Sequence, residues 1–135
     1  NIKDGYVINV GVKFNIIVKR GHNKNDVLFK AIQRVKEFFA PDKWQMNQPI
    51  VLSDLAYQIS LVDGVVSLVP PEVNNPNKDL ILIENKHKTS DGYSGNIYDI
   101  GSASQEGIVY PSMDPSIFEL KKPNSDIEGK VVGDR

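Results

Sequence analysis

The chain has 135 residues, of which 40% are hydrophobic and 24% charged, and this is the size and composition of one soluble domain. It contains no cysteine, which excludes disulfides, thiolate metal sites and cysteine nucleophiles. Sixteen basic and seventeen acidic residues give a net charge of −1, so we expect neither nucleic acid nor a membrane surface as a partner.

The sequence shows no segment that spans a membrane or directs secretion. No apolar stretch approaches the ~20 residues needed to cross a bilayer, and no basic stretch precedes an apolar one near the start. The chain begins at Asn1 without a methionine, which predicts a piece of a longer protein or a processed product.

Strict alternation of apolar residues predicts a long first strand from Tyr6 to Arg20. Seven apolar residues share one face of it: Tyr6, Ile8, Val10, Val12, Phe14, Ile16 and Val18. Gly11 lies on the other face, where it predicts a bulge or a bend that splits the strand.

Two amphipathic helices are predicted next. The first has Asn25 or Asp26 as its N-cap and runs to about Phe39, before Pro41. Its apolar stripe is Leu28, Ala31, Ile32, Val35, Phe38 and Phe39. The second helix has Ser53 as its N-cap. Its apolar stripe is Leu55, Ile59 and Val62, and Asp63-Gly64 ends it.

Short strands follow at Val65–Val69 and Leu80–Glu84, which completes a compact unit over residues 1–84. Residues 70–135 hold six of the eight prolines and six of the ten glycines. Beyond residue 84, Asp91-Gly92 is a hairpin candidate, and apolar islands occur at residues 108–110, 117–120 and 131–132. We therefore predict an α+β fold: a small mixed or antiparallel sheet with two helices on one face (β-α-α-β-β). Residues 85–135 would form an extended arm with short strands, packed on this unit or on a neighbouring copy.

Residues suited to catalysis are sparse. His87 lies between two lysines in a predicted loop, and the simplest interpretation is a solvated side chain. An enzyme that uses His87 with Asp91 or Asp99 is one open hypothesis, and it requires the imidazole to be held by a carboxylate in a cleft. His87 and Asp91 gain no third ligand nearby, so we expect no metal or other cofactor.

Trp44, the single tryptophan, has two possible roles. It can pack in the core beneath the first helix, or it can anchor an interface, since tryptophan is enriched in binding hot spots.

Four short segments follow the first helix in a fixed order. They are Phe38-Phe39-Ala40-Pro41-Asp42-Lys43-Trp44-Gln45, Asn47-Gln48-Pro49-Ile50, Ser53-Asp54-Leu55 and Val62-Asp63-Gly64-Val65. In this order they resemble the C-terminal region of the baseplate J-like proteins of contractile-tailed phages, especially the baseplate wedge subunits of T-even-like phages. The resemblance covers roughly residues 6–70, and the segment from Ile108 to Glu119 is similar to the ending of those subunits.

The resemblance implies a structural role in the virion, in a tail baseplate assembled in the host cytoplasm, with no catalytic residues to carry over. It also implies dimerisation and contacts with other wedge proteins in the baseplate ring. A long strand with open edges can pair with a second copy, so we expect a homodimer through sheet edges or the arm. The residues we expect at interfaces are Trp44, Tyr110, Ile117 and Phe118. The alternative is a small binding domain that captures a ligand or carbohydrate with the 85–105 loop.

Overall fold

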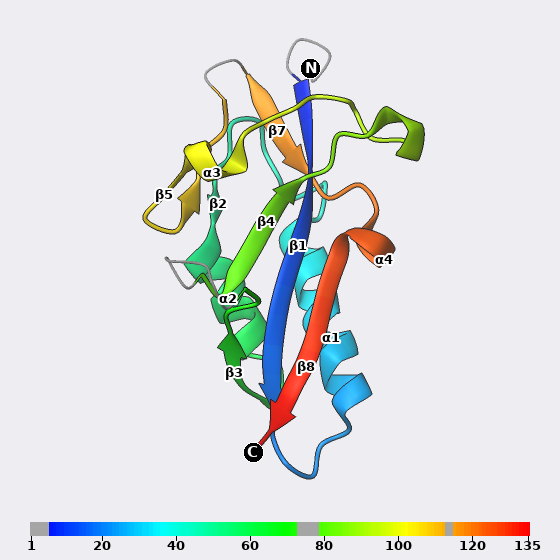
Figure 1. Cartoon of the computed structure of the whole chain (residues 1–135), viewed down its shortest axis with the longest axis vertical. Helices are drawn as coiled ribbons and strands as arrows, with labels where there is room; N and C mark the ends of the chain where they lie inside the picture. The colour runs from blue at the N-terminus through cyan, green and yellow to red at the C-terminus, as the bar shows by residue number, and fades with distance from the viewer. Residues whose placement is uncertain (1–5, 73–78, 113–114) are drawn as a thin grey trace.

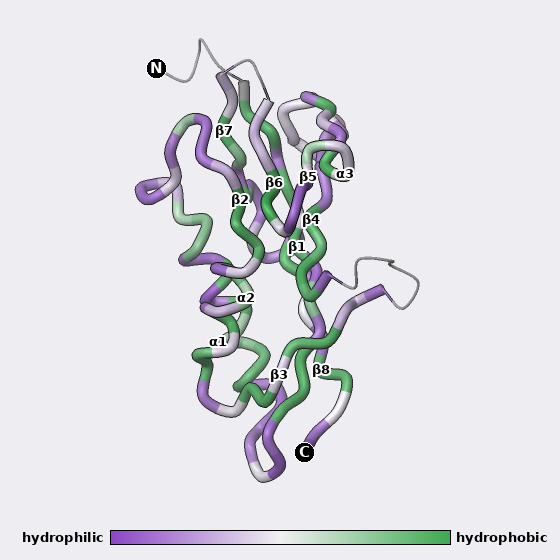
Figure 2. The backbone as a smooth tube through the Cα atoms, turned by 90° about the vertical axis from the view of Figure 1, so that its left-hand side faces the viewer, coloured by the Kyte–Doolittle hydropathy of each residue, from purple (hydrophilic) through white to green (hydrophobic). Residues whose placement is uncertain are grey.

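The computed structural model describes residues 6–72, 79–112 and 115–135. It confirms the α+β class, because two helices, α1 (Lys24–Phe38) and α2 (Leu52–Ser60), pack on one face of a mixed sheet built around β1 (Tyr6–Val18). Figure 1 shows the sheet in front with both helices behind it. Figure 2 shows the same two layers from the side, with hydrophobic residues following the strands and hydrophilic residues in the turn at the lower end.

Two antiparallel strands pair with β1 along one of its edges. β3 (Val65–Val69) pairs with residues 15–18 of β1, and β4 (Ile81–Asn85) pairs with residues 10–14. Both were predicted as strands from their apolar residues, β4 one residue earlier than it is found.

Two parallel strands from the end of the chain also pair with β1. β7 (Ser116–Glu119) pairs with residues 6–9, and β8 (Ile127–Asp134) pairs with residues 12–18. The β1 residues that pair with β8 also pair with β3 or β4. Because each residue of a strand has one neighbouring strand on each edge, β3 and β4 lie end to end on the edge opposite β8. Two strands of residues 85–135, β7 and β8, are thus part of the same sheet as β1.

The face of β1 towards the helices is fully buried, as the alternation predicted. Its buried residues are Ile8, Val10, Val12, Phe14, Ile16 and Val18. The helices add Val27, Ala31, Val35, Leu55 and Ile59 to the same core. Burying each large aliphatic or aromatic side chain in this way contributes about 1.5–3 kcal/mol, so this stripe is a large favourable contribution to the stability of the fold.

The bulge predicted at Gly11 was wrong. The register of β1 shifts instead between Ile16 and Ile17 against β8, and between Ile17 and Val18 against β3. A Cβ atom at Gly11 would lie 2.7 Å from Lys86 Cε and 3.3 Å from the Asp126 carbonyl oxygen. The Lys86 side chain is flexible and can move aside, so the tight approach of the Asp126 backbone, and not a bend in the strand, is what favours glycine here.

Both predicted N-caps were wrong. The N-cap of α1 is Asn23, whose side-chain oxygen accepts hydrogen bonds from the backbone N–H groups of Asn25 and Asp26. α2 begins at Leu52, directly after the two-residue strand β2 (Ile50–Val51), and has no side-chain cap. The Leu52 N–H donates instead to the Gly107 carbonyl at 2.9 Å, so tertiary pairing replaces the cap.

The hairpin predicted at Asp91-Gly92 was also wrong, because residues 89–91 form a short 3₁₀ helix, η2 (Thr89–Asp91), that ends in a left-handed Gly92. A tight hairpin occurs further along, between β5 (Ser104–Gln105) and β6 (Ile108–Val109). β6 pairs on its other edge with β2, which makes a small second sheet of order β2-β6-β5. Two four-residue helices complete the described chain: α3 (Ile100–Ala103) and α4 (Pro123–Asp126).

Candidate interaction site

Trp44 lies in the core. Its side chain is only 7% exposed, and its ring packs 5.0 Å from the Phe39 centroid and 5.6 Å from that of Phe38. The indole Nε1 has no hydrogen-bond partner among the described residues. The structure thus favours the packing role over the interface role for this residue.

Tyr98 joins two of the other residues expected at an interface. Its hydroxyl donates to the Tyr110 carbonyl at 2.7 Å, and its ring lies 6.1 Å from that of Phe118. Phe118 is buried and Ile117 is half-buried, whereas Tyr110 is 44% exposed. Of the four expected residues, Tyr110 alone presents a large exposed side chain. Sequence reasoning missed Tyr98, which carries no local signal for these contacts.

The arrangement required for catalysis by His87 is not formed within the described residues. His87 is exposed, and no carboxylate in residues 6–72, 79–112 or 115–135 forms an ion pair with it. Asp99 instead caps α3: the Ser102 hydroxyl and N–H both donate to its carboxylate, and these bonds lower the pKa of Asp99. The same part of the chain holds no cluster of three His, Asp or Glu side chains that could bind a metal ion.

A buried polar network fixes the first half of the 85–105 segment against β1. The Asn9 side chain is fully buried, donating to Glu119 Oε1 at 2.7 Å and accepting from the Ser94 N–H at 2.8 Å. The Asn85 amide donates to the carbonyls of Asn9 and Asn96. A satisfied network of this kind gives the segment one defined path across the sheet.

Tyr93 ties the same segment to α4. Its hydroxyl donates to Asp126 Oδ1 at 2.5 Å, and this hydrogen bond is the main reason why the pKa of Tyr93 is raised to about 12. Lys122 Nζ lies 4.9 Å from the centre of the Tyr93 ring, a cation–π contact. Lys122 Nζ and Lys121 Nζ also donate to the carbonyls of Asp91 and Gly92, respectively.

We call the face of the sheet away from the helices the open face. Figure 1 shows β1, β4 and β8 on this face, in front of α1 and α2. Lys13 lies at its centre, with its Nζ 3.0 Å from Glu84 of β4 and 4.0 Å from Glu128 of β8. The hydrogen bond to Glu84 is the main reason why the pKa of Lys13 is raised. Leu80 directly precedes β4, and the alternation along the strand assigns it to the same face as Glu84, which pairs with Gly11. Its side chain is 40% exposed.

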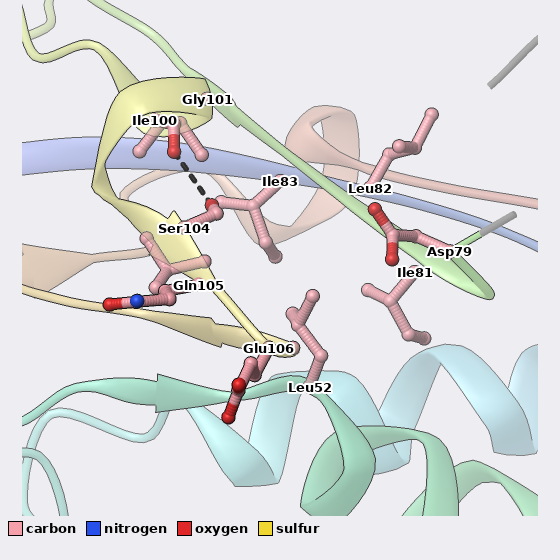
Figure 3. Close-up of a pocket in the computed structure, with 12 residues that line it drawn as sticks. Leu52, Asp79, Ile81, Leu82, Ile83, Ile100, Gly101, Ser104, Gln105 and Glu106 are labelled. Carbon is pink, nitrogen blue, oxygen red and sulfur yellow. Dashed lines mark hydrogen bonds between the residues drawn. The ribbon is translucent and has the colours of Figure 1, made fainter. Parts of the chain in front are cut away.

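A groove of about 690 Å³ separates β4 from the β5–β6 hairpin. Figure 3 shows Leu52, Ile81 and Ile83 between the two, with Asp79 on the β4 side and Glu106 at the tip of the hairpin. The other lining residues are Leu82, Ile100, Gly101, Ser104, Gln105, Gly107 and Val109. The volume is within the range of about 300–1,000 Å³ that is usual for ligand sites.

Among the described residues, no helix is both long and apolar enough to cross a lipid bilayer. No protein-family model matches the chain, and a search of curated proteins finds no relative.

Proposed function

We propose that this chain is a structural module of the tail baseplate of a contractile-tailed phage, where it associates with a second copy of itself and with neighbouring wedge proteins. The ordered segments between Phe38 and Val65 support the proposal through their resemblance to baseplate J-like proteins. In this role the protein would be part of the virion and would act by contact alone.

The observation that carries the proposal is the open face. A sheet with helices on one side buries one face in its own core and leaves the other accessible to solvent or to a partner. Here the second face combines an exposed Leu80 with the charged row Glu84–Lys13–Glu128. Apolar side chains surrounded by paired charges are typical of surfaces that bind other proteins.

Two measurements test the proposal. Purified particles of a phage that encodes this sequence should contain its peptides by mass spectrometry, and antibodies against the chain should label the baseplate end of the tail. Sedimentation equilibrium at micromolar concentration should give twice the 15.1 kDa mass of the chain. Particles that lack its peptides would rule out the virion role, and a monomer at every concentration would rule out self-association.

The groove favours a second candidate function, a domain that binds a small ligand or carbohydrate. Four groove residues, Ile100, Gly101, Ser104 and Gln105, belong to the 85–105 segment that the sequence singled out. A glycan array probed with the labelled chain tests this candidate, with the Gln105→Ala variant as a check on the site. Signals that survive this substitution, or no signal at all, would count against it.

A further inference from the structure

The groove between β4 and β5 is bordered by two strand edges that lack a partner. β4 pairs with β1 and β5 pairs with β6, and no other described strand pairs with either of them. The unpaired edge of a strand presents a row of N–H and C=O groups that can accept a further strand.

The hydrogen-bond pattern shows which groups are free on β4. The Lys86 N–H donates to the Asn9 carbonyl at 2.8 Å, so residues 84 and 82, two and four positions earlier, also direct their backbone bonds to β1. Ile81 and Ile83 therefore point their N–H and C=O groups away from β1, on the side that lines the groove.

The β5 side is less open but still polar. The Tyr110 N–H donates to the Ala103 carbonyl, so the next residue, Ser104, points its carbonyl away from β6. The Ser104 N–H donates to the Gly101 carbonyl at the end of α3. The Ser104 hydroxyl donates to the Ile100 carbonyl at 2.6 Å, the bond drawn in Figure 3. The Ser104 carbonyl and the Gln105 side chain remain for a bound molecule.

The side chains around these edges define what would fit. Six of the twelve lining residues are aliphatic, and the charged ones are Asp79 and Glu106, with no Lys, Arg or aromatic residue among those described. An aliphatic groove with two carboxylates is complementary to an extended peptide with branched apolar residues and one basic residue.

We infer that this groove binds an extended segment of a partner protein as an additional strand on β4, with a lysine or arginine of that segment near Asp79 and Glu106. The bound segment would receive backbone hydrogen bonds from Ile81 and Ile83 and would bury the aliphatic floor. The open face would stay free, so one copy could hold a strand in the groove and contact another protein through Lys13 and Leu80.

The test uses the full 135-residue chain, labelled with ¹⁵N, and two capped pentapeptides: Thr-Val-Lys-Val-Thr and Thr-Val-Glu-Val-Thr. The lysine peptide should shift the amide signals of Ile81 and Ile83 and slow their hydrogen exchange at least about tenfold. The amides of Leu82 and Glu84 should keep their exchange rates, because they are already bonded to β1. This alternation distinguishes strand addition from loose binding nearby.

Charge variants complete the experiment. Asp79→Asn and Glu106→Gln should each weaken the lysine peptide about two- to fivefold, the range expected for an exposed ion pair. Glu128→Gln on β8 is the matched control and should leave binding unchanged. Equal binding of the two peptides, protection of all four amides alike, or no binding at millimolar peptide would overturn the inference. None of these results depends on whether the chain dimerises or occurs in a virion.

Discussion

The side-chain amide of Asn9 donates to Glu119 Oε1 at 2.7 Å, and this bond joins residues that are 110 positions apart in the sequence. Asn9 belongs to the central strand β1, and Glu119 is the last residue of β7, its register partner. Since Asn9 also accepts from the Ser94 N–H, a single buried side chain connects the start, the 85–105 segment and the final third of the chain.

Replacing Asn9 should therefore loosen all three parts at once. We expect Asn9→Ala to lower the free energy of unfolding by about 1–3 kcal/mol, because Glu119 and the Ser94 N–H lose their buried partner. Urea denaturation measures the change. Asn124→Ala, at an exposed position of α4, is the control and should stay within about 0.5 kcal/mol of the native chain. Equal effects of the two variants would show that the network adds little stability.

Trp44→Ala should be among the most damaging single substitutions. Removing a buried tryptophan costs about 3–5 kcal/mol, since the cavity against Phe38 and Phe39 cannot fully collapse. Tyr57→Ala, at an exposed position of α2, should cost less than about 0.5 kcal/mol. Urea denaturation beside sedimentation tests the role: a loss under about 1 kcal/mol with weakened association would instead identify Trp44 as an interface residue.

Stability should fall at alkaline pH through Tyr93. Its pKa is raised from 10 to about 12 in the folded chain, so the unfolded chain loses the hydroxyl proton first. The stabilisation is thus fully present below pH 10 and is lost as the pH rises from 10 to about 12. Urea midpoints of the native chain and of Tyr93→Phe should converge over this interval. Parallel curves for the two proteins would contradict the assigned role of the Asp126 hydrogen bond.

Self-association through the open face predicts a specific difference between two exposed leucines. Leu80→Lys should raise the dimer dissociation constant at least about tenfold, because it places a charge in the apolar part of the proposed contact. Leu61→Lys is the matched control: Leu61 is 47% exposed against 40% for Leu80, but it follows α2 on the helical side. Sedimentation equilibrium measures the dissociation constants of both variants. Identical constants would exclude the open face as the dimer contact.

Much of the first half of the fold could be predicted because its signals are local. The period-two pattern from Ile8 to Val18 identified both the strand and its buried face. The helical period identified Leu55 and Ile59 as the buried side of α2, and Val62, which is also buried, lies just beyond the end of the helix. The N-caps could not be predicted as reliably, since Asn23 and Asn25 are both good capping residues and Leu52 is held by the distant Gly107.

The candidate site is formed by long-range contacts that no local sequence pattern predicts. Tyr98 and the edges of β4 and β5 become notable only when residues far apart in the chain meet at the groove or at Phe118. The sequence did mark the 85–105 segment as polar and available. It could not show that the first half of this segment is hydrogen-bonded to β1 while the second half lines a groove.

By itself, the sequence determined one buried strand face, two helical stripes and the class of the fold, because each follows from the spacing of apolar residues within one element. Tertiary structure alone decided that β8 pairs with β1. β8 contains two glycines and few apolar residues, and a Cβ at Gly129 would lie 2.5 Å from Phe14 Cζ. The glycine is needed because the Phe14 ring lies over it, and a fit between residues 115 positions apart leaves no periodic trace in the chain.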